Sequence, residues 1–416
     1  MKFLPVFTFL IGLFFYSCSD APTTIGGDYI PTNVEFKSYI LKASEFEINS
    51  KIADASNSSA EFSQEMLVGS SNDGTIAHGL FYIIDSLFIA KGSRAENKAI
   101  SEVVLRLRPT GYRYGDTTNR EGGFDVIEIP QSLAGNVKWN DSVISKIQNA
   151  TSIGSFTGKF SDTTFINIPL DRVLITQFLS TYLKDGKIQK MLCLRSRADS
   201  KSIVGIWGSS GNAGVIADSL KPQLKVSYGD TTLTLIASAS NWISKSFVNP
   251  GVGKIVFAGG ESIRTLIKFN LDSIPKDAVV HKAELTLTVD TNSSKFGTFK
   301  LSRYLVGYSA SDSTKENLKS GSIVSTSRRA AKDSLSYLNT FSFPVLGPII
   351  SDWLLFSRGS GNQKNNGIIF ALNRSLRFDQ PLEVNSVDKL VFYGNDTQDT
   401  TKRPRLAITY SISSNK

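Results

Sequence analysis

Apolar and polar residues alternate along most of this chain in short runs. Valine, isoleucine, leucine, phenylalanine and threonine dominate the runs, and glycine, asparagine, aspartate and serine separate them about every ten residues. A period of two is typical of strands with one buried face. The helical pattern that a parallel α/β fold needs after each strand is missing. We therefore predict an all-β protein built from jelly-roll-like β-sandwiches.

The second half of the chain repeats the strand pattern of the first half in the same order and at nearly constant spacing. The matching segments are residues 100–108 with 280–288, 166–170 with 341–345, and 222–228 with 404–410. The repeat predicts two tandem sandwich domains, over residues 35–229 and 230–416. A helical spacing of apolar residues at 171–179 and at 348–354 predicts one short helix in each domain.

The N-terminus has the pattern of an export signal. A basic start is followed by an apolar run that is too short for an ordinary membrane-spanning helix, and Cys18 stands where the run ends. Residues 1–17 are predicted to be a signal peptide, and Cys18 resembles the acylated cysteine of a bacterial lipobox. Residues 18–34 then form a tether, and the lipid bilayer becomes a partner through Cys18. The expected location is the outer membrane, on its periplasmic side or at the cell surface.

Charge and composition exclude some classes of partner. The formal net charge is +9 over 416 residues, and the basic residues are spread along both halves. Nucleic-acid binding needs basic residues concentrated on one face with aromatic residues between them, and the sequence shows no such run. A diffuse positive field is compatible with an anionic polysaccharide or a phosphate-bearing surface.

Few residues suit nucleophilic or metal-dependent chemistry. The two histidines, His78 and His281, lie in different halves, and Cys193 sits in an apolar run typical of a buried thiol. No catalytic residue and no cofactor are predicted, although the 37 carboxylates leave a paired-carboxylate glycosidase open. A structural calcium is a weaker alternative, with Asp396 and Asp399 as candidate ligands.

Exposed aromatic side chains are the usual platforms for sugar rings, and four residues are candidates on this ground. Tyr112 and Tyr114 lie in a segment that the second half does not match, which favours a binding role. Trp207 aligns with a framework segment of the second half, and Trp242 completes the set of candidate ligand-binding residues.

Aspartate followed by a hydroxyl residue and then an aliphatic residue or threonine recurs more often than composition predicts. The motif resembles the O-glycosylation acceptor of exported Bacteroidota proteins, and turn chemistry is the alternative explanation. The candidate acceptors are Ser86, Thr117, Ser142, Thr163, Ser219, Thr231, Ser273, Ser313, Ser334 and Thr400.

Several framework segments resemble a known family when taken together. In the second half these are residues 266–275, 283–289, 341–353, 365–370 and 403–410. Their order resembles the DNRLRE-type β-sandwich family, part of which is classed among carbohydrate-binding modules. In the first half, residues 25–31, 112–116 and 124–129 are similar to an uncharacterised family of Bacteroidota lipoproteins. The resemblance implies a sandwich fold and an envelope location, and it transfers no catalytic residue.

The sequence thus favours a non-catalytic envelope lipoprotein that binds glycan or another macromolecule. The alternative is a structural or assembly subunit that binds another envelope protein. A polysaccharide hydrolase or lyase is the third possibility.

Overall fold

The computed structural model describes most of the two predicted domains. The described residues are 34–52, 65–85, 100–116, 118, 121–129, 141–162, 164–173, 188–209, 216–228, 230–245, 254–259, 263–298, 304–310, 320–326, 328–329, 340–373 and 387–413. The predicted signal peptide, Cys18 and the tether up to residue 33 lie outside them. None of the helices in these ranges is long and apolar enough to cross a membrane.

Two sheets of the described chain pack face to face as a first sandwich. The larger, eight-stranded sheet contains β3 (Glu65–Ser70), β4 (Ile76–Asp85), β6 (Pro109–Gly115), β7 (Glu121–Ile129), β8 (Ser152–Lys159), β10 (Ile188–Ser196), β11 (Ser202–Trp207) and β14 (Ala239–Lys245). Its order is β6-β11-β3-β4-β10-β7-β8, with β14 also paired to β4. The four-stranded sheet contains β5 (Ile100–Leu107), β9 (Ile166–Pro169), β12 (Gln223–Tyr228) and β13 (Thr231–Ile236). Its order is β13-β12-β5-β9.

The other two sheets of the described chain form a second sandwich. The seven-stranded sheet contains β2 (Phe46–Ile52), β15 (Ile255–Ala258), β16 (Ile263–Phe269), β18 (Tyr304–Ala310), β19 (Ser320–Thr326), β22 (Ile368–Asn373) and β23 (Lys389–Phe392). Its order is β19-β18-β22-β16-β15-β23, with β2 paired to β16. The five-stranded sheet contains β1 (Val34–Ile40), β17 (Val279–Thr288), β20 (Arg328–Arg329), β21 (Thr340–Phe343) and β24 (Arg405–Ser413). Its order is β1-β24-β17-β21-β20.

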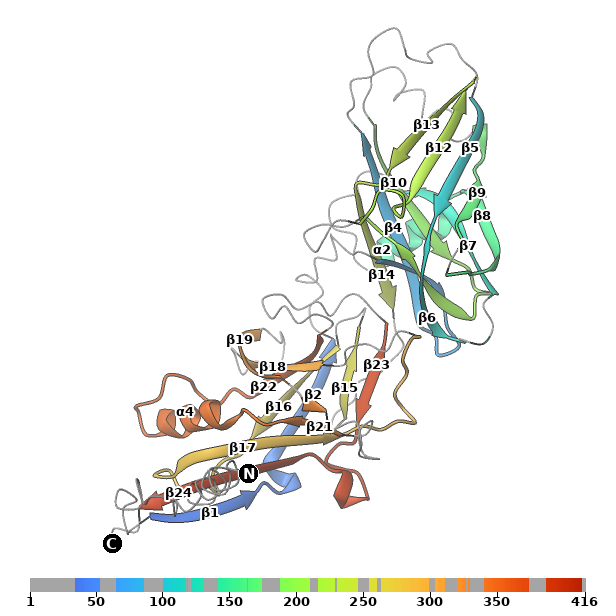
Figure 1. Ribbon diagram of the computed structural model, residues 1–416. Coiled ribbons are helices and arrows are strands. Elements are labelled where there is room, and N and C mark those ends of the chain that lie inside the picture. The colour runs from blue at the N-terminus through green and yellow to red at the C-terminus, as the bar shows by residue number, and fades with distance from the viewer. Residues whose placement is uncertain are drawn as a thin grey trace, which may run out of the picture.

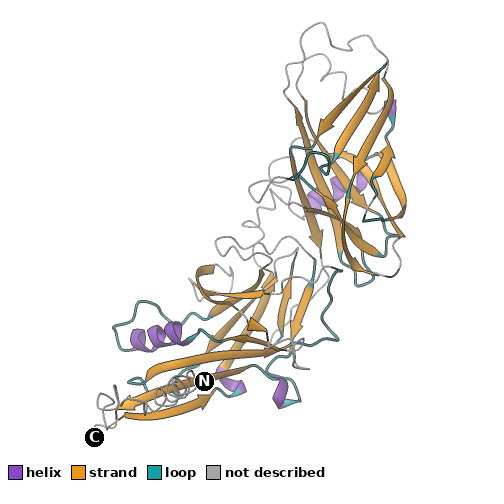
Figure 2. Ribbon diagram, in the orientation of Figure 1, coloured by secondary structure: helices purple, strands orange, loops and turns teal. Residues whose placement is uncertain are grey.

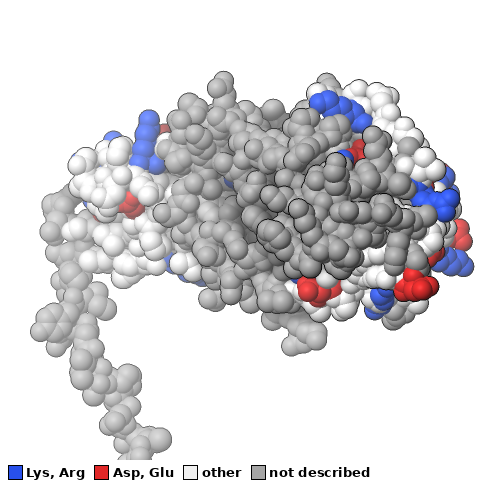
Figure 3. Space-filling view, turned by 90° about the horizontal axis from the view of Figure 1, so that it is seen from above, with Lys and Arg blue, Asp and Glu red and all other residues white. Residues whose placement is uncertain are grey.

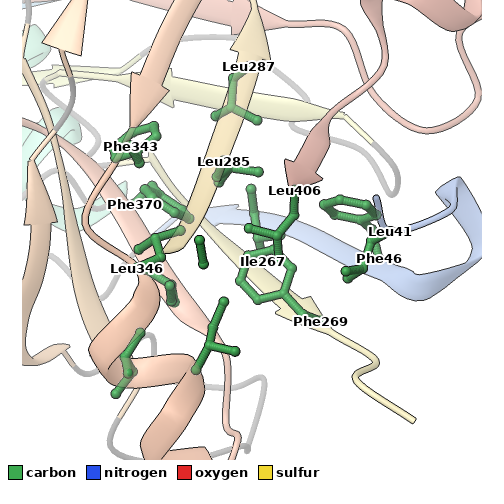
Figure 4. Packing of buried hydrophobic residues seen from close by; sticks show 14 of the residues in the cluster. Leu41, Phe46, Ile267, Phe269, Leu285, Leu287, Phe343, Leu346, Phe370 and Leu406 are labelled. Carbon is green, nitrogen blue, oxygen red and sulfur yellow. The ribbon is translucent and has the colours of Figure 1, made fainter. Parts of the chain in front are cut away.

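Each sandwich encloses its own apolar core. Strand alternation explains it: Leu105 and Leu107 of β5 are fully buried, and the residues between them face outward. Leu285 and Leu287 of β17 repeat this arrangement in the second sandwich, where they pack against phenylalanines of the facing sheet (Figure 4). The all-β sandwich fold predicted from the sequence is confirmed, and strands dominate both bodies (Figure 2).

The described helices are short. α4 (Gly347–Ser357) covers the predicted helix at 348–354 and buries Ile350 and Trp353 against the second core. α2 (Asp141–Asn149) packs on the outer face of the eight-stranded sheet, in a stretch that the sequence presents as an irregular connection. The helix predicted at 171–179 lies mostly outside the described residues.

The repeated segments occupy equivalent places. In the first sandwich β5 lies between β9 and β12, and in the second β17 lies between β21 and β24. Both central strands carry a bulge at the same point, where the register shifts around Ser101 in β5 and around His281 in β17. The Ser101 hydroxyl bonds to the Ser227 carbonyl at 3.0 Å, and His281 Nε2 lies 2.8 Å from the Ser411 hydroxyl. The two repeats therefore share the position of this β-bulge as well as the order of their strands.

The first two strands of each repeat lie in the sandwich of the other repeat. β1 pairs along its whole length with β24, and β2 pairs along its whole length with β16 (Figure 1). In return, β13 pairs with β12 and β14 pairs with β4. Because β12 and β24 are equivalent closing strands, β1 and β13 fill equivalent positions. The two halves thus exchange their leading strands reciprocally.

Buried hydroxyl groups secure β2 within the second sandwich. β15 and β16 pair only at Ala258 and Ile263, and beyond this point they separate around β2. The Ser50 hydroxyl of β2 lies 2.7 Å from the Thr265 hydroxyl of β16 and donates to the Lys254 carbonyl at 2.5 Å. These contacts satisfy polar groups that would otherwise be buried without partners.

The boundary expected at residues 229 and 230 therefore does not separate the two bodies in space. The first sandwich is built from strands between residues 65 and 245, and the second from residues 34–52 together with residues 255–413. Alternating apolar residues predict that a segment is a strand, but they do not identify its partner. This is why the exchange was missed from the sequence.

Candidate functional site

A cleft lies at one end of the second sandwich. It has a volume of about 880 Å³ and lies between the start of β2, the end of β16 with its following loop, and the C-terminal half of α4. Its apolar lining comes from Phe46, Phe269, Ile274, Trp353 and Leu354. This size lies within the usual range of small-molecule sites.

The helix α4 brings one exposed aromatic ring to this cleft. Trp353 and Leu354 face the core, whereas Leu355 and Phe356 remain 41% and 42% exposed. Phe356 lines the cleft, and its neighbour Leu355 does not. The helix ends at Ser357, and two residues later Gly359, whose φ of +84° suits glycine, turns the chain away from the helix axis. Phe356 thus offers an accessible ring face above an apolar floor.

The loop after α4 supplies an amide to the cleft. The Asp352 carboxylate accepts a 3.0 Å hydrogen bond from the Asn362 amide, which holds this loop against the helix. Asn365 follows in the loop and donates its Nδ2 to the Phe269 carbonyl at 2.7 Å. Its Oδ1 is buried and has no hydrogen-bond partner among the described residues. Asn365 therefore fastens the loop to the end of β16 at the wall of the cleft.

The carboxylate of Glu45 is held by three hydrogen bonds at the edge of the cleft. Donors are the Tyr39 hydroxyl at 2.9 Å, the Lys42 backbone amide at 2.5 Å and the Ser273 hydroxyl at 2.5 Å. Burial by itself raises the pKa of Glu45, but the hydrogen bonds outweigh burial and lower this pKa below its ordinary value. A general acid needs the opposite shift.

Three of the four aromatic residues selected from the sequence are not exposed. Tyr112, Tyr114 and Trp242 are only 2%, 1% and 2% exposed, and they pack together with Val387 of the second half. They therefore cannot serve as open platforms for sugar rings in this structure. Trp207, at the end of β11, is half-buried and keeps part of its indole accessible. The prediction for Tyr112 and Tyr114 was wrong because a segment without a counterpart in the second half need not be exposed. Here that segment packs against Val387, which is far away in the sequence.

The buried aromatic cluster contains residues of both sandwiches, because Val387 of the second half packs with Tyr112, Tyr114 and Trp242 of the first sandwich. Figure 1 shows the end of the first sandwich that carries β6 beside the end of the second that carries β23. The Tyr112 hydroxyl donates to Asp388 at 3.0 Å, and the Gly297 amide donates to the same oxygen at 2.7 Å. Arg113 and Thr298 add two contacts, from the Arg113 amide to the Thr298 hydroxyl and from the Thr298 amide to the Arg113 carbonyl. A bridge of this kind joins the bodies through buried polar contacts as well as apolar packing.

A second carboxylate, Asp73, supports the same junction. It accepts hydrogen bonds from Ser71, from the Thr75 amide at 3.1 Å and from the Tyr114 hydroxyl at 2.7 Å. The Lys295 ammonium of the second half lies 3.4 Å away. Burial raises the pKa of Asp73, but the hydrogen bonds lower it far more, so Asp73 remains charged in the folded protein.

The histidines and the cysteine are in structural positions. Burial lowers the pKa of His78 to about 4, and its Nδ1 accepts from the Ser196 amide at 3.0 Å. His281 packs against Phe36 with ring centroids 5.2 Å apart. Cys193 is fully buried, as predicted, and burial raises its pKa strongly.

The two candidate calcium ligands, Asp396 and Asp399, lie in different surroundings. The Asp399 carboxylate caps the short turn η7 (Thr400–Lys402) through the Thr401 amide and pairs with Lys402 at 3.2 Å. Asp396 lines a small hollow of about 330 Å³ together with Lys254 and Lys389. Across the described ranges, no group of three or more His, Cys, Asp or Glu residues converges on one point.

The candidate glycan acceptors divide into two groups. Ser142, Ser219, Thr231, Ser273 and Thr400 are exposed. Ser86, Thr117, Thr163, Ser313 and Ser334 lie outside the described residues. The exposed hydroxyls are accessible to a modifying enzyme, but Ser273 also donates to Glu45.

The cleft itself was not recognised from the sequence, because its wall includes the start of β2. The pairing of β2 with β16 places residues 44–47 opposite α4, and no local pattern predicts that pairing. Comparison with known proteins does not add a further assignment: no protein-family model matches the chain, and no curated protein matches it.

Proposed function

We propose that this chain is a non-catalytic lipoprotein of the outer membrane, acylated at Cys18, that binds glycan in the cleft of the second sandwich. The observation that carries the proposal is the accessible Phe356 ring, which lines a cleft of suitable volume together with apolar and polar side chains. A sugar presents one apolar face and several hydroxyl groups, and it fits a site of this composition.

Binding without turnover is supported by the state of the cleft carboxylate. Glu45 has a lowered pKa and three hydrogen-bond donors, so it is poorly suited to protonate a leaving group. The hydrolase or lyase alternative therefore has less support from this cleft. Release of reducing ends from any polysaccharide by the purified protein would restore that alternative.

A matched pair of variants tests the proposal. Phe356→Ala removes the ring that lines the cleft, whereas Leu355→Ala removes an equally exposed neighbour that does not. On an array of glycans, Phe356→Ala should weaken binding about tenfold, which corresponds to roughly 1.4 kcal/mol. Leu355→Ala should bind as the parent protein does. Equal binding by all three proteins would refute the cleft as the glycan site.

One observation favours the alternative of a subunit that binds another envelope protein. Phe36 and Ile40 of β1 are 61% and 48% exposed on the outer face of the five-stranded sheet. Exposed apolar residues on a sheet at an open edge favour protein contacts. Chemical cross-linking in intact cells, compared with the variant Phe36→Ser/Ile40→Ser, tests this alternative.

A further inference from the structure

The strand β1 forms one edge of the five-stranded sheet. It pairs with β24 on one side, and no described strand pairs with it on the other side. Figure 1 shows β1 on the side of the second sandwich that faces away from the first sandwich, so the first sandwich does not cover this edge. Phe36 and Ile40 of β1 are 61% and 48% exposed. An open edge with exposed apolar side chains is a template for pairing with another strand.

The register of β1 identifies the backbone groups that point to the open edge. In an antiparallel pair, the N–H and C=O of one residue point to the same side, and those of the next residue point to the opposite side. The Leu41 amide donates to the Leu406 carbonyl at 3.0 Å, and the pairing continues without a shift from Ile40 to Val34. The odd-numbered residues of 34–41 therefore bond to β24, and the even-numbered residues direct their backbone groups to the open edge.

The side chains of β1 complement a second β1 that runs in the opposite direction. When two copies pair antiparallel with Phe36 opposite Phe36, Glu35 of each copy lies opposite Lys37 of the other, and Val34 lies opposite Ser38. Within one chain, Glu35 and Lys37 form a 3.0 Å ion pair, and their side chains are 57% and 41% exposed. Opposite charges and aromatic pairs that face each other across two antiparallel strands stabilise the pairing.

The same register also satisfies the backbone groups at the edge. Phe36 exchanges both backbone hydrogen bonds with its copy, and Val34 exchanges both with Ser38, because all three residues face the open edge. A shift of one residue would place edge-facing residues opposite residues that bond to β24. A shift of two residues would set Glu35 against Glu35 or Lys37 against Lys37, which is destabilising. The register centred on Phe36 avoids both conflicts.

We propose that β1 pairs antiparallel with β1 of a second copy of this chain, centred on Phe36, and joins the two five-stranded sheets into one continuous sheet. The contact is isologous, because a twofold axis through the Phe36 pair relates the two copies. Charges of both signs are intermixed on the described surface that is visible in Figure 3, so this face carries no single-sign field that would repel a second copy. The inference is independent of the cleft and of glycan binding, and it assigns the edge of β1 to a second copy instead of a different envelope protein.

The expected dimer is weak in solution. Backbone pairing over residues 34–38 buries less surface than the interface of a stable dimer. Two copies that are anchored in one membrane, as the acylation proposed for Cys18 implies, meet at a raised local concentration. We therefore expect a dissociation constant in the micromolar range for the solubilised protein, and a larger dimer fraction in the membrane.

Charge reversal at positions 35 and 37 tests the pairing. Sedimentation velocity of the detergent-solubilised full-length protein over a range of concentrations gives the dissociation constant of the dimer. Glu35→Lys and Lys37→Glu should each raise this constant at least tenfold, because each places like charges across the interface. An equimolar mixture of the two variants should recover the dimer, since the two lysines of one variant then face the two glutamates of the other. The ion pair within each chain stays broken in the mixture, so only pairing between chains explains the recovery.

Matched controls separate this interface from general effects of charge and detergent. Lys282→Glu and Glu284→Lys make the same charge changes at the 2.9 Å ion pair of β17, which is not an edge strand. These two variants, alone or mixed, should dimerise as the parent protein does. Phe36→Lys changes the residue on the twofold axis and should raise the dissociation constant at least tenfold. Ile40→Lys changes an exposed residue beyond the paired segment and should alter it less than twofold.

Several results would overturn the inference. A parent protein that is monomeric at every concentration would show that a second copy does not take this edge. Equal effects of the variants in β1 and in β17 would assign the association to overall charge. Equal effects of Phe36→Lys and Ile40→Lys would contradict the register centred on Phe36. A mixture of Glu35→Lys and Lys37→Glu that stays monomeric, while circular dichroism shows that both variants are folded, would exclude the proposed pairing.

Discussion

The hydroxyl of Tyr112 donates a 3.0 Å hydrogen bond to the carboxylate of Asp388, 276 residues later in the chain. Tyr112 belongs to β6 of the first sandwich, and Asp388 directly precedes β23 of the second. Both residues are almost fully buried. The hydrogen bond joins the two sandwiches, because each of them supplies one of its two partners.

Tyr112→Phe should therefore destabilise the protein. The substitution removes one donor from a buried carboxylate and leaves the Gly297 amide in place, which costs about 1–3 kcal/mol. Urea unfolding gives the difference in the free energy of unfolding. Tyr228→Phe is the control, because Tyr228 is also buried and its hydroxyl has no hydrogen bond to the described residues. Equal effects of both variants would contradict a special role for the junction bond.

Removal of residues 34–52 should unfold the second sandwich. These residues supply one strand to each of its sheets and bury Leu41, Phe46 and Ile48 in its core. Each such side chain contributes about 1.5–3 kcal/mol on burial. Limited proteolysis of a protein that starts at residue 53 should cleave within residues 255–413 and spare residues 65–245. A synthetic peptide of residues 34–52 added in trans should restore protection, and a fully protected truncated protein would argue against the exchange.

The pH dependence of stability should contain a contribution from His78. Its pKa is about 4 in the folded protein and near 6.5 when exposed, so the unfolded chain binds a proton first as the pH falls. The contribution is complete above pH 6.5 and is lost between pH 6.5 and pH 4, by on the order of 3 kcal/mol.

His78→Asn tests this contribution, because asparagine can accept from the Ser196 amide but does not titrate in this range. The variant should show a flatter change in the free energy of unfolding between pH 6.5 and pH 4. An unchanged slope would assign the pH dependence to other groups.

Sequence patterns were sufficient for the strands and for their duplication. β5 and β17 were predicted because Leu105 and Leu285 belong to clear alternating runs, and the structure places them at the centres of equivalent sheets. The helix at 348–354 was predicted from the spacing of Ile349, Ile350 and Trp353. Local periodicity carries this information because it depends only on neighbouring residues.

The same patterns do not predict which strands pair with each other. Nothing near Phe46 indicates that it faces Phe269, with ring centroids 5.6 Å apart. Burial of Tyr112 and Tyr114 likewise depends on Val387 and Asp388, which lie far along the chain. The cleft and the junction both arise from contacts of this distant kind, and both were missed.

The placement of β1 and β2 also has a consequence for the proposed anchor at Cys18. The first described strand, β1, begins at Val34 and lies in the body made mostly from the C-terminal half. If Cys18 is acylated as proposed, the strand closest to the anchor along the chain belongs to that body, and the body of residues 65–245 is joined to the anchor through it. A force that pulls on the body of residues 65–245 would then be transmitted to the anchor across the buried aromatic cluster and the hydrogen bond from Tyr112 to Asp388.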